Sequence, residues 1–341
     1  MIMKIVTFGE IMMRLATPAR LRFSQARELE LTYGGGEANV AVSLCNFGLD
    51  AAFVSKLPNN PFGDAAIATL RGLGVDTSHI ARGGERIGVY FLETGASQRA
   101  SVVVYDRANS AISGVLAGEF AWEKIFAGAS WFHFTGITPA LGPDVAAATK
   151  EAARAAKEMG LTVSCDLNYR KKLWTPAQAQ SAMSEIMEFV DVAIGNEEDA
   201  EKVFGIKAQN TDVAGGEIGH ASYEEVARTL AAKFGFQSVA ITLRESFSAD
   251  KNGWSAMLLH QNEILHSKRY ELQIVDRVGG GDSFAGGLIY GLATAKSGQD
   301  ALEFAVAASC LKHSVAGDFN LVSVGEVEAL AGGDGSGRVQ R

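Results

Sequence analysis

The sequence has few cysteines, and their arrangement excludes the usual cysteine chemistry. The 341-residue chain holds three, an odd number, at the scattered positions Cys45, Cys165 and Cys310. No two of them form a CxxC pair. Reduced thiols in the core are therefore expected, without a disulfide framework.

Long apolar runs and excess positive charge are also missing. No apolar stretch reaches the ~18 residues that span a bilayer, and the opening MIMKIVTFGE is typical of a strand and not of a secretory signal. The net charge of -8 argues against a broad surface for DNA or RNA, although a small cationic pocket is compatible with it. A hydrophobic content of 47% allows a large core. We expect a soluble cytoplasmic protein without a nucleic-acid or membrane partner.

Several sequence motifs are absent as well. No GK[ST] occurs, so a Walker A loop is excluded, and the dinucleotide fingerprint fails because the sixth position counted from Gly279 is Phe284. The six histidines show no metal-ligand spacing. His133 lies within the apolar run WFHFTG and is interpreted as a core residue.

What the sequence does contain is a repeated alternation of short apolar runs and helical patterns. Examples are KIVTFGE, then EANVAVSLCNFG ending at Gly48, then AAFVSKLP, then FGDAAIATLRGLG ending at Gly74. Apolar strands separated by helices predict an α/β fold with a mostly parallel central sheet covered by helices on both faces.

One region interrupts this alternation. Residues 86–107 hold two strand-like runs with no helix between them, which predicts an antiparallel hairpin that could form a lid. Residues 206–221 are predicted to form a polar surface loop, and residues 331–341 a disordered tail.

The late stretch DRVGGGDSF raises the question of a functional turn. Apolar residues after Asp282 follow a helical period, so Asp282 stands at the start of a helix, directly after Gly279, Gly280 and Gly281. Glycines let backbone N–H groups approach a ligand, and a helix start favours an anion. Taken alone, the pattern is equally compatible with Asp282 as a simple N-cap.

Three further segments have both a functional and an ordinary interpretation. YGGGEANVAV could bind a ligand or form a tight turn with Asn39 facing solvent. In DLNYRKKLW, Asn168 and Arg170 would point the same way if the segment is extended, at a strand end where ligands bind in parallel sheets. The carboxylates of GNEEDA could order a hydrated Mg²⁺ or begin an acidic helix.

Taken together and in this order, these segments resemble the ribokinase-like (PfkB) family of carbohydrate kinases. The resemblance runs from Lys4 to about Leu330 and rests on two signatures, one near Gly34, Gly35 and Asn39 and one at Asp276 and 279–282. It implies one kinase domain over 1–330, with a small β-sheet lid built from about 10–33 and 86–107. GGGEANVA, VYFLE, YDRANSA, DLNYRKKLW and AGDFNLVS are most similar to the kinases of 2-keto-3-deoxygluconate.

The resemblance also implies roles. Asp282 would be the catalytic base, with a depressed pKa at the helix start, and Gly279, Gly280 and Gly281 would form the anion hole. The substrate, a sugar acid, would be bound by Gly34, Gly35, Asn39, Tyr90, Tyr105, Arg107, Arg170 and Asp318. ATP would lie against Asn168, Asn196, Thr242, Arg244, Ser246 and Phe247. Mg²⁺ would be held near Asp199 through water, and a monovalent cation is a further possibility.

The sequence departs from the family pattern at several of these positions. Gly280 replaces an alanine, a change expected to be sterically tolerated, and Arg277 and Val278 replace small hydroxyl residues. Asp199 is one methylene shorter than the usual glutamate, and Arg244 stands at a usual glycine. These departures bear on how the nucleotide and metal are held.

Several alternatives stay open at this point. Arg107 could bind the substrate carboxylate or pair with a surface acid. The acceptor could be 2-keto-3-deoxygluconate, its galactonate epimer or a neutral sugar such as fructose, and a non-catalytic sugar sensor is a more distant possibility. An exposed lid sheet predicts a homodimer or higher homo-oligomer through the hairpin.

Overall fold

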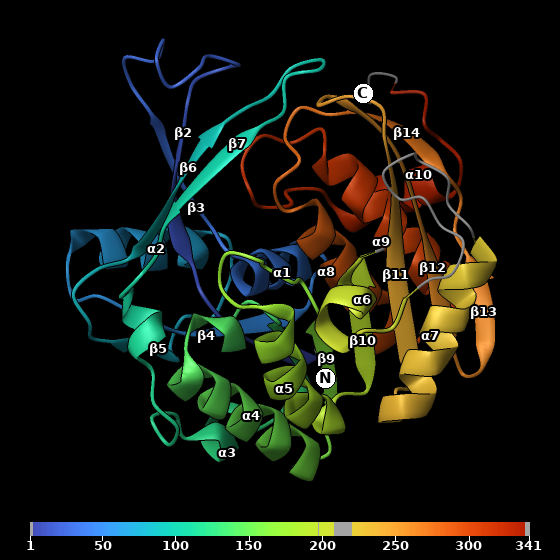
Figure 1. Cartoon of the computed structure of the whole chain (residues 1–341), viewed down its shortest axis with the longest axis horizontal. Coiled ribbons are helices and arrows are strands. Elements are labelled where there is room, and N and C mark those ends of the chain that lie inside the picture. Colours follow the sequence, from blue (N-terminus) through green and yellow to red (C-terminus); the bar gives the residue numbers. More distant parts are fainter. Residues whose placement is uncertain (1–2, 197, 208–219, 338–341) are drawn as a thin grey trace.

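The strands of the chain form two sheets of unequal size (Figure 1). The structure is a computed structural model that describes residues 3–196, 198–207 and 220–337. The larger sheet has the spatial order β13 (Glu263–His266), β12 (Lys251–His260), β11 (Ser238–Ser246), β10 (Val192–Asn196), β9 (Thr162–Asp166), β8 (Ala129–Thr135), β1 (Lys4–Phe8), β4 (Asp50–Leu57) and β5 (Ile80–Arg82), and β14 (Tyr270–Gln273) pairs with β12.

The body of this sheet is parallel, as the alternation predicts. Every neighbouring pair from β5 to β11 runs parallel, whereas β12 pairs antiparallel with β11, β13 and β14. This antiparallel edge departs from the prediction made from the alternation of strands and helices. Only residues 247–250, FSAD, separate β11 from β12, and they lack the Asn-Gly or Asp-Gly pair that marks a tight hairpin.

Helices cover both faces of the sheet. Their bounds are α1 (Gly36–Asn46), α2 (Pro61–Gly72), α3 (Trp122–Ile125), α4 (Pro143–Glu158), α5 (Pro176–Ile186), α6 (Asp199–Phe204), α7 (His220–Phe234), α8 (Gly280–Ala293), α9 (Gly298–Lys312) and α10 (Val324–Ala331), with short 3-10 turns at Ala111–Gly114, Pro139–Leu141 and Met187–Phe189. Successive side chains of a strand alternate between faces. In β1, Ile5 belongs to the hydrophobic cluster that contains residues of α1, α2, α8 and α9, whereas Val6 and Phe8 belong to the cluster that contains residues of α3 to α7.

The helix ends follow local sequence signals. Thr175 forms a capping box with Gln178 at the start of α5, and Pro176 occupies the first helical position. Gly48 and Gly74, predicted to end helices, have φ values of 84° and 86°, which glycine adopts without strain.

The smaller sheet projects from one end of the molecule, in the upper left of Figure 1. Its order is β3 (Glu30–Gly34), β2 (Met12–Ala16), β6 (Gly88–Glu93) and β7 (Val102–Asp106). The hairpin predicted over 86–107 is confirmed, because β6 and β7 pair antiparallel. The α/β fold class with a second small sheet is therefore confirmed, and the closing motion of a lid stays a prediction.

Several smaller expectations can be compared with the described residues. The three cysteines are free thiols. His133 is fully buried against Ser164, and burial lowers the pKa of His133 to about 3, so its interpretation as a core residue is confirmed. No helix in the described ranges is long and apolar enough to cross a membrane. Residues 208–219 of the predicted loop 206–221 lie outside the described residues, whereas 220–221 begin α7. Of the predicted tail 331–341, residues 338–341 lie outside the described residues, and Ala331 ends α10.

Candidate active site

A cavity of about 330 Å³ lies between the small sheet and the carboxyl ends of the parallel strands. Asp166, Asn196 and Thr242 line it from β9, β10 and β11, and Tyr90 and Tyr105 line it from the small sheet. The first turns of α1 and α8 close its floor. Ligands of parallel α/β sheets bind at this edge, so the cavity is the candidate site.

Most residues proposed from the sequence meet in this cavity. Its lining includes Gly35, Asn39, Tyr90, Tyr105, Arg107, Asn168, Arg170, Asn196, Asp199, Thr242, Arg244, Gly279, Gly280, Gly281, Asp282 and Asp318. Three do not line it: Gly34, Ser246 and Phe247, of which Phe247 is 53% exposed. Asn168 has a φ of 39°, so the segment after β9 is bent and the expected extended geometry is wrong, although Asn168 and Arg170 both reach the cavity.

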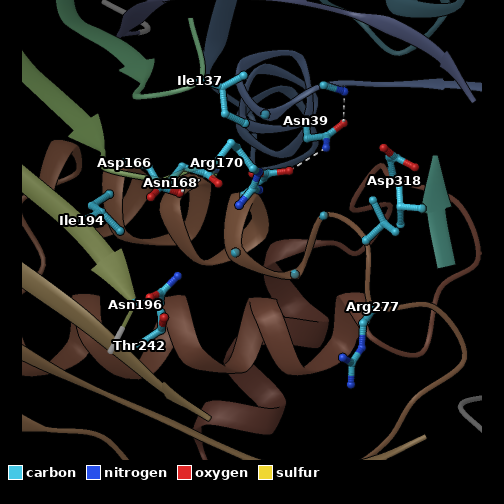
Figure 2. Close-up of a pocket in the computed structure, with 18 of the residues that line it drawn as sticks. Asn39, Ile137, Asp166, Asn168, Arg170, Ile194, Asn196, Thr242, Arg277 and Asp318 are labelled. Carbon is cyan, nitrogen blue, oxygen red and sulfur yellow. Dashed lines mark hydrogen bonds between the residues drawn. The ribbon is translucent and has the colours of Figure 1, made fainter. Parts of the chain in front are cut away.

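Asp282 joins the two glycine-rich segments. It is the third residue of α8, whose N-cap is Gly279, and it makes no capping bond, so the N-cap interpretation is wrong. Instead, Asn39 Nδ2 donates to Asp282 Oδ2 at 2.6 Å, and Asn39 Oδ1 accepts from the Gly35 amide at 3.2 Å (Figure 2). One asparagine therefore fixes both the carboxylate and the N-terminal turn.

The pKa of Asp282 is shifted upward, opposite to the expected direction. Burial raises the pKa of Asp282 to about 6, outweighing the lowering by the Asn39 hydrogen bond and by the charges of Arg170 and Lys312, while Asp318 raises it further. The position at a helix start predicts a lowered pKa, but the desolvation of the buried carboxylate outweighs that effect. A carboxylate with this pKa is still mostly ionised at pH 7 and is a stronger base than an exposed aspartate.

Close approaches explain why both glycine segments need glycine. A Cβ on Gly34 would overlap the Asp318 carboxylate, and one on Gly35 would overlap the backbone carbonyl of Glu10. Gly279 has a φ of 81° and lies against the Asp318 carbonyl. The backbone turns at the site can therefore pack without side chains between them.

The next two glycines differ from each other. A Cβ on Gly280 would lie 2.5 Å from Cε1 of the buried His313 ring, whereas one on Gly281 would meet nothing within 4 Å. Glycine at position 280 is thus compatible with the packing, as expected, whereas the alanine usual in the family would not fit here, because His313 fills the space beside it. The residue that excludes a side chain at position 280 is His313, which lies 33 residues downstream. No motif in the sequence relates the two positions.

A buried ion-pair network supports the glycine turn before α8. This network was not predicted from the sequence. The Arg14 guanidinium, from the small sheet, bridges Asp276 at 2.5 Å and Asp318 at 2.8 Å. The Tyr90 hydroxyl lies 2.6 and 2.7 Å from the two oxygens of Asp318. Asp276 in turn accepts from the amides of Val278 and Gly317. Asp318 thus connects the small sheet with the glycine turn.

The two arginines proposed for a carboxylate have different surroundings. Arg107 forms a buried ion pair with Glu10, whose other oxygen accepts from Ser110 at 2.9 Å. Its partner is therefore a buried acid and not the surface acid considered above. Arg170 has no ion pair within 4 Å in the part of the chain that the structure describes, yet its charge lowers the pKa of Asp282, of Asp166 and of Asp199.

The acidic residues at the strand ends separate into two kinds. Asp199 accepts from the amides of Tyr169 at 3.1 Å and Asn196 at 2.9 Å, so both oxygens are engaged in holding loops. Asp166 lines the cavity, and burial together with the charges of Asp199 and Asp282 raises its pKa well above the usual range. Asp166 was not among the residues proposed from the sequence.

Two arginines lie toward the β11 side of the cavity. Arg244 comes from β11, and Arg277 precedes the glycine turn, and both line the cavity. In Figure 2, Asn196 and Thr242 lie together, apart from Arg277. Burial lowers the pKa of Arg277, and the charge of Arg244 lowers it further, so the two cations are close enough to repel. Both are departures from the family pattern, and together they favour an anion between them.

Glu37 lies below the N-terminal turn, fully enclosed. Its Oε1 accepts from the Thr135 amide at 2.9 Å, the Thr135 hydroxyl at 2.8 Å and the Thr138 hydroxyl at 2.5 Å. Burial raises the pKa of Glu37 to about 7. Glu37 therefore ties α1 to the end of β8 from beneath and does not contact the cavity.

A turn rich in glycine, a buried carboxylate and a sheet-edge cavity define a small-molecule phosphotransferase site. Residues 3–322 match the model of the pfkB family carbohydrate kinases, and the chain belongs to this family. It is therefore a kinase that transfers phosphate to an alcohol group.

Individual relatives cover nearly the whole chain. The crystal structure of 2-dehydro-3-deoxygluconokinase from Thermotoga maritima is similar, with 55% identity, a TM-score of 0.94 and coverage of 97% of this chain and 100% of that one. A putative 2-keto-3-deoxygluconate kinase from Enterococcus faecalis has 29% identity and a TM-score of 0.91 over 99% of each chain. The 2-dehydro-3-deoxygalactonokinase of Haloferax volcanii is 34% identical over 97% of this chain and 98% of its own.

Proposed function

We propose that the protein uses ATP to phosphorylate the terminal hydroxyl of 2-dehydro-3-deoxygluconate, giving the 6-phosphate. The observation that carries this proposal is the meeting of Asp282 and Arg170 in one cavity. The first is a buried base beside an anion-binding turn, and the second is a cation that no ion pair within the described residues neutralises. The 55% identity to the Thermotoga maritima enzyme supports the same substrate.

Asp282 accepts the proton of the attacking hydroxyl, and the glycine turn receives the transferred phosphate. Within the described residues, the amides of Gly281 and Asp282 have no carbonyl partner, as expected in the first turn of a helix. They remain available for an anion, whose charge the helix start also favours. Asn39 keeps the carboxylate aimed at the turn.

Arg170 is the principal partner that we propose for the substrate carboxylate. Arg107 and Tyr105 line the same cavity, with the Arg107 guanidinium carbon 5.3 Å from the Tyr105 ring centroid. Because Arg107 already neutralises Glu10, we propose that it only donates its remaining hydrogen bonds to the carboxylate end of the substrate. Each charge-assisted hydrogen bond contributes ~1.5–3 kcal/mol. Two such bonds would favour a sugar acid over its neutral analogue by about a hundredfold or more.

We propose that the polyphosphate of ATP binds at Arg244 and Arg277, in the cavity that Asn196 and Thr242 also line. The donor set for Mg²⁺ is sparse: the described residues contain no group of three or more His, Cys, Asp or Glu side chains that could hold a metal. This fits an ion carried mainly by phosphates and water, as is usual for Mg²⁺. Asp166 would attract it through water, and bound Mg²⁺ would neutralise charge on the phosphates.

The small sheet is the proposed lid and dimer surface. Its outward side exposes Leu31, Val102 and Val104, each 45–48% exposed. Apolar strands at a sheet face and edge are commonly covered by a second copy. Closing the sheet over the cavity would exclude water from the phosphate.

The galactonate epimer is the second candidate acceptor, because the Haloferax volcanii relative is named for it. The epimers differ by one inverted hydroxyl, which leaves both the carboxylate and the terminal hydroxyl available to Arg170 and Asp282. Only the relative turnover of the two compounds separates them.

The test is ADP release with both epimers, fructose and ribose under identical conditions. We expect the highest kcat/KM with 2-dehydro-3-deoxygluconate and a loss of ~10²–10⁴-fold in Asp282→Asn. Asp300→Asn is the matched control, since Asp300 is an exposed acid in the first turn of α9. Turnover of fructose without turnover of either acid would refute the proposed substrate, and full activity of Asp282→Asn would refute the mechanism.

A further inference from the structure

Lys312 is a fully buried lysine that the proposed reaction does not use. It is the last residue of α9, and its side chain is 0% exposed. Lysine is almost never fully buried unless paired, because an ammonium group loses hydration there at a large cost. Its position therefore requires a specific explanation.

The side chain runs beneath the glycine turn. A Cβ placed on Gly279 would be 3.3 Å from Lys312 Cε, so the methylene chain lies directly under the first glycine. The ammonium donates to the Val315 carbonyl at 3.1 Å, in the turn that follows α9. The next residue, His313, accepts from the amides of Val275 and Asp276, which ties this turn to the segment before the glycines.

The charges around Lys312 are mainly negative. Burial lowers the pKa of Lys312, and Asp276, Asp318 and Asp282 raise it, while Arg14 lowers it. Three carboxylates thus lie near the base of the turn. The other cations nearby are Arg14 from the small sheet and, on the cavity side, Arg170 and Arg277. Removing the charge of Lys312 would make the field beneath the amides more negative and therefore less favourable to an approaching phosphate.

We propose that Lys312 is a built-in counter-cation that makes the glycine turn attractive to the transferred phosphate. It does not touch the cavity and acts through the backbone of Gly279, so it is a positioning residue. Its charge offsets one of the carboxylates needed for the Arg14 network and for catalysis. The inference rests on the kinase reaction of the proposed function and not on which sugar acid is the acceptor.

A purely structural role makes a different prediction. If Lys312 only anchored the turn through Val315, then an uncharged side chain of similar length would change stability and leave the electrostatics of Asp282 alone. If it supplies charge, the same substitution should raise the kinetic pKa of Asp282, because Lys312 lowers that pKa in the intact protein.

The experiment compares Lys312→Met with Lys296→Met, a control in which the lost lysine is partly exposed and paired with Glu328 at 3.0 Å. Using the acceptor with the highest turnover, we expect Lys312→Met to lower kcat by about 10–100-fold and to shift the acid limb of the pH–rate profile upward. Lys296→Met should stay within about twofold. Binding of ATP, measured by calorimetry, should weaken only in Lys312→Met.

A second variant keeps the proposal testable if Lys312→Met does not fold. Lys312→Ala is assayed with added propylammonium and, separately, with 1-propanol, after thermal unfolding has established that it is folded. Rescue by the cation alone supports the proposal. Equal rescue by both, no rescue by either, or a folded Lys312→Met with an unchanged profile and ATP affinity overturns it. A wild-type protein that binds ATP but turns over no sugar acid would refute the proposed substrate only.

Discussion

Asn39 Nδ2 donates to Asp282 Oδ2 at 2.6 Å, across 243 positions of sequence. The bond joins the first turn of α1 to the first turn of α8. It orients the proposed base, and it also opposes the rise in the pKa of Asp282 caused by burial.

The pH dependence of the reaction should follow this balance. Asp282 acts as a base only when ionised, so kcat/KM should fall as pH drops through about 6 and level off above it. In Asn39→Ala the hydrogen bond that lowers the pKa is lost, and the acid limb should move to higher pH. Initial rates from pH 5 to 9 measure both. A limb that stays in place in Asn39→Ala would contradict the proposed coupling.

Arg170→Gln should impair recognition of the acid and leave the fold intact. Removing a charge-assisted partner of the carboxylate should raise KM for the sugar acid by ~10–100-fold. The loss should be much smaller for a neutral sugar that is turned over. Arg154→Gln is the control, because Arg154 is 60% exposed on α4. Equal effects on acid and neutral acceptors would assign Arg170 to another role.

Arg14→Met should destabilise the protein strongly. It leaves Asp276 and Asp318 buried without their cation, and breaking such a pair costs ~3–5 kcal/mol. Arg20→Met removes an exposed pair with Asp250 and should cost ~0–1 kcal/mol. Urea unfolding of the two variants gives the comparison. Similar midpoints would show that the network contributes little.

Gly280→Ala and Gly281→Ala should differ in their effect on the stability of the protein. The first places a Cβ against His313 and should lower the free energy of unfolding by ~1–3 kcal/mol. The second meets open space in a helix and should be neutral or stabilising. Gly280→Ala combined with His313→Ser should recover part of the loss. Equal stability of the two single variants would refute the steric argument.

The fold and the membership of the cavity were largely accessible from the sequence. Strand and helix periods are local, and the glycine segments mark where backbone must approach backbone, so Gly35, Asn39 and 279–282 could be placed together. Partners could not be predicted, since nothing in sequence spacing relates Arg14 to Asp318 or Gly280 to His313. The predicted direction of the pKa shift of Asp282 was wrong for the same reason. Desolvation raises this pKa and depends on what packs around the carboxylate, whereas the helix start alone predicts a lowered pKa.

The ion pairs of Arg14 also determine how early the small sheet can complete its folding during translation. Arg14 lies 262 residues before Asp276 and 304 before Asp318. At ~5–20 residues per second, the ribosome delivers these carboxylates about 13–61 seconds after the arginine. During that interval the small sheet lacks the partners of its buried cation. Rare codons late in the message would lengthen this interval. They would therefore delay the folding of the small-sheet strands, which are encoded near its start.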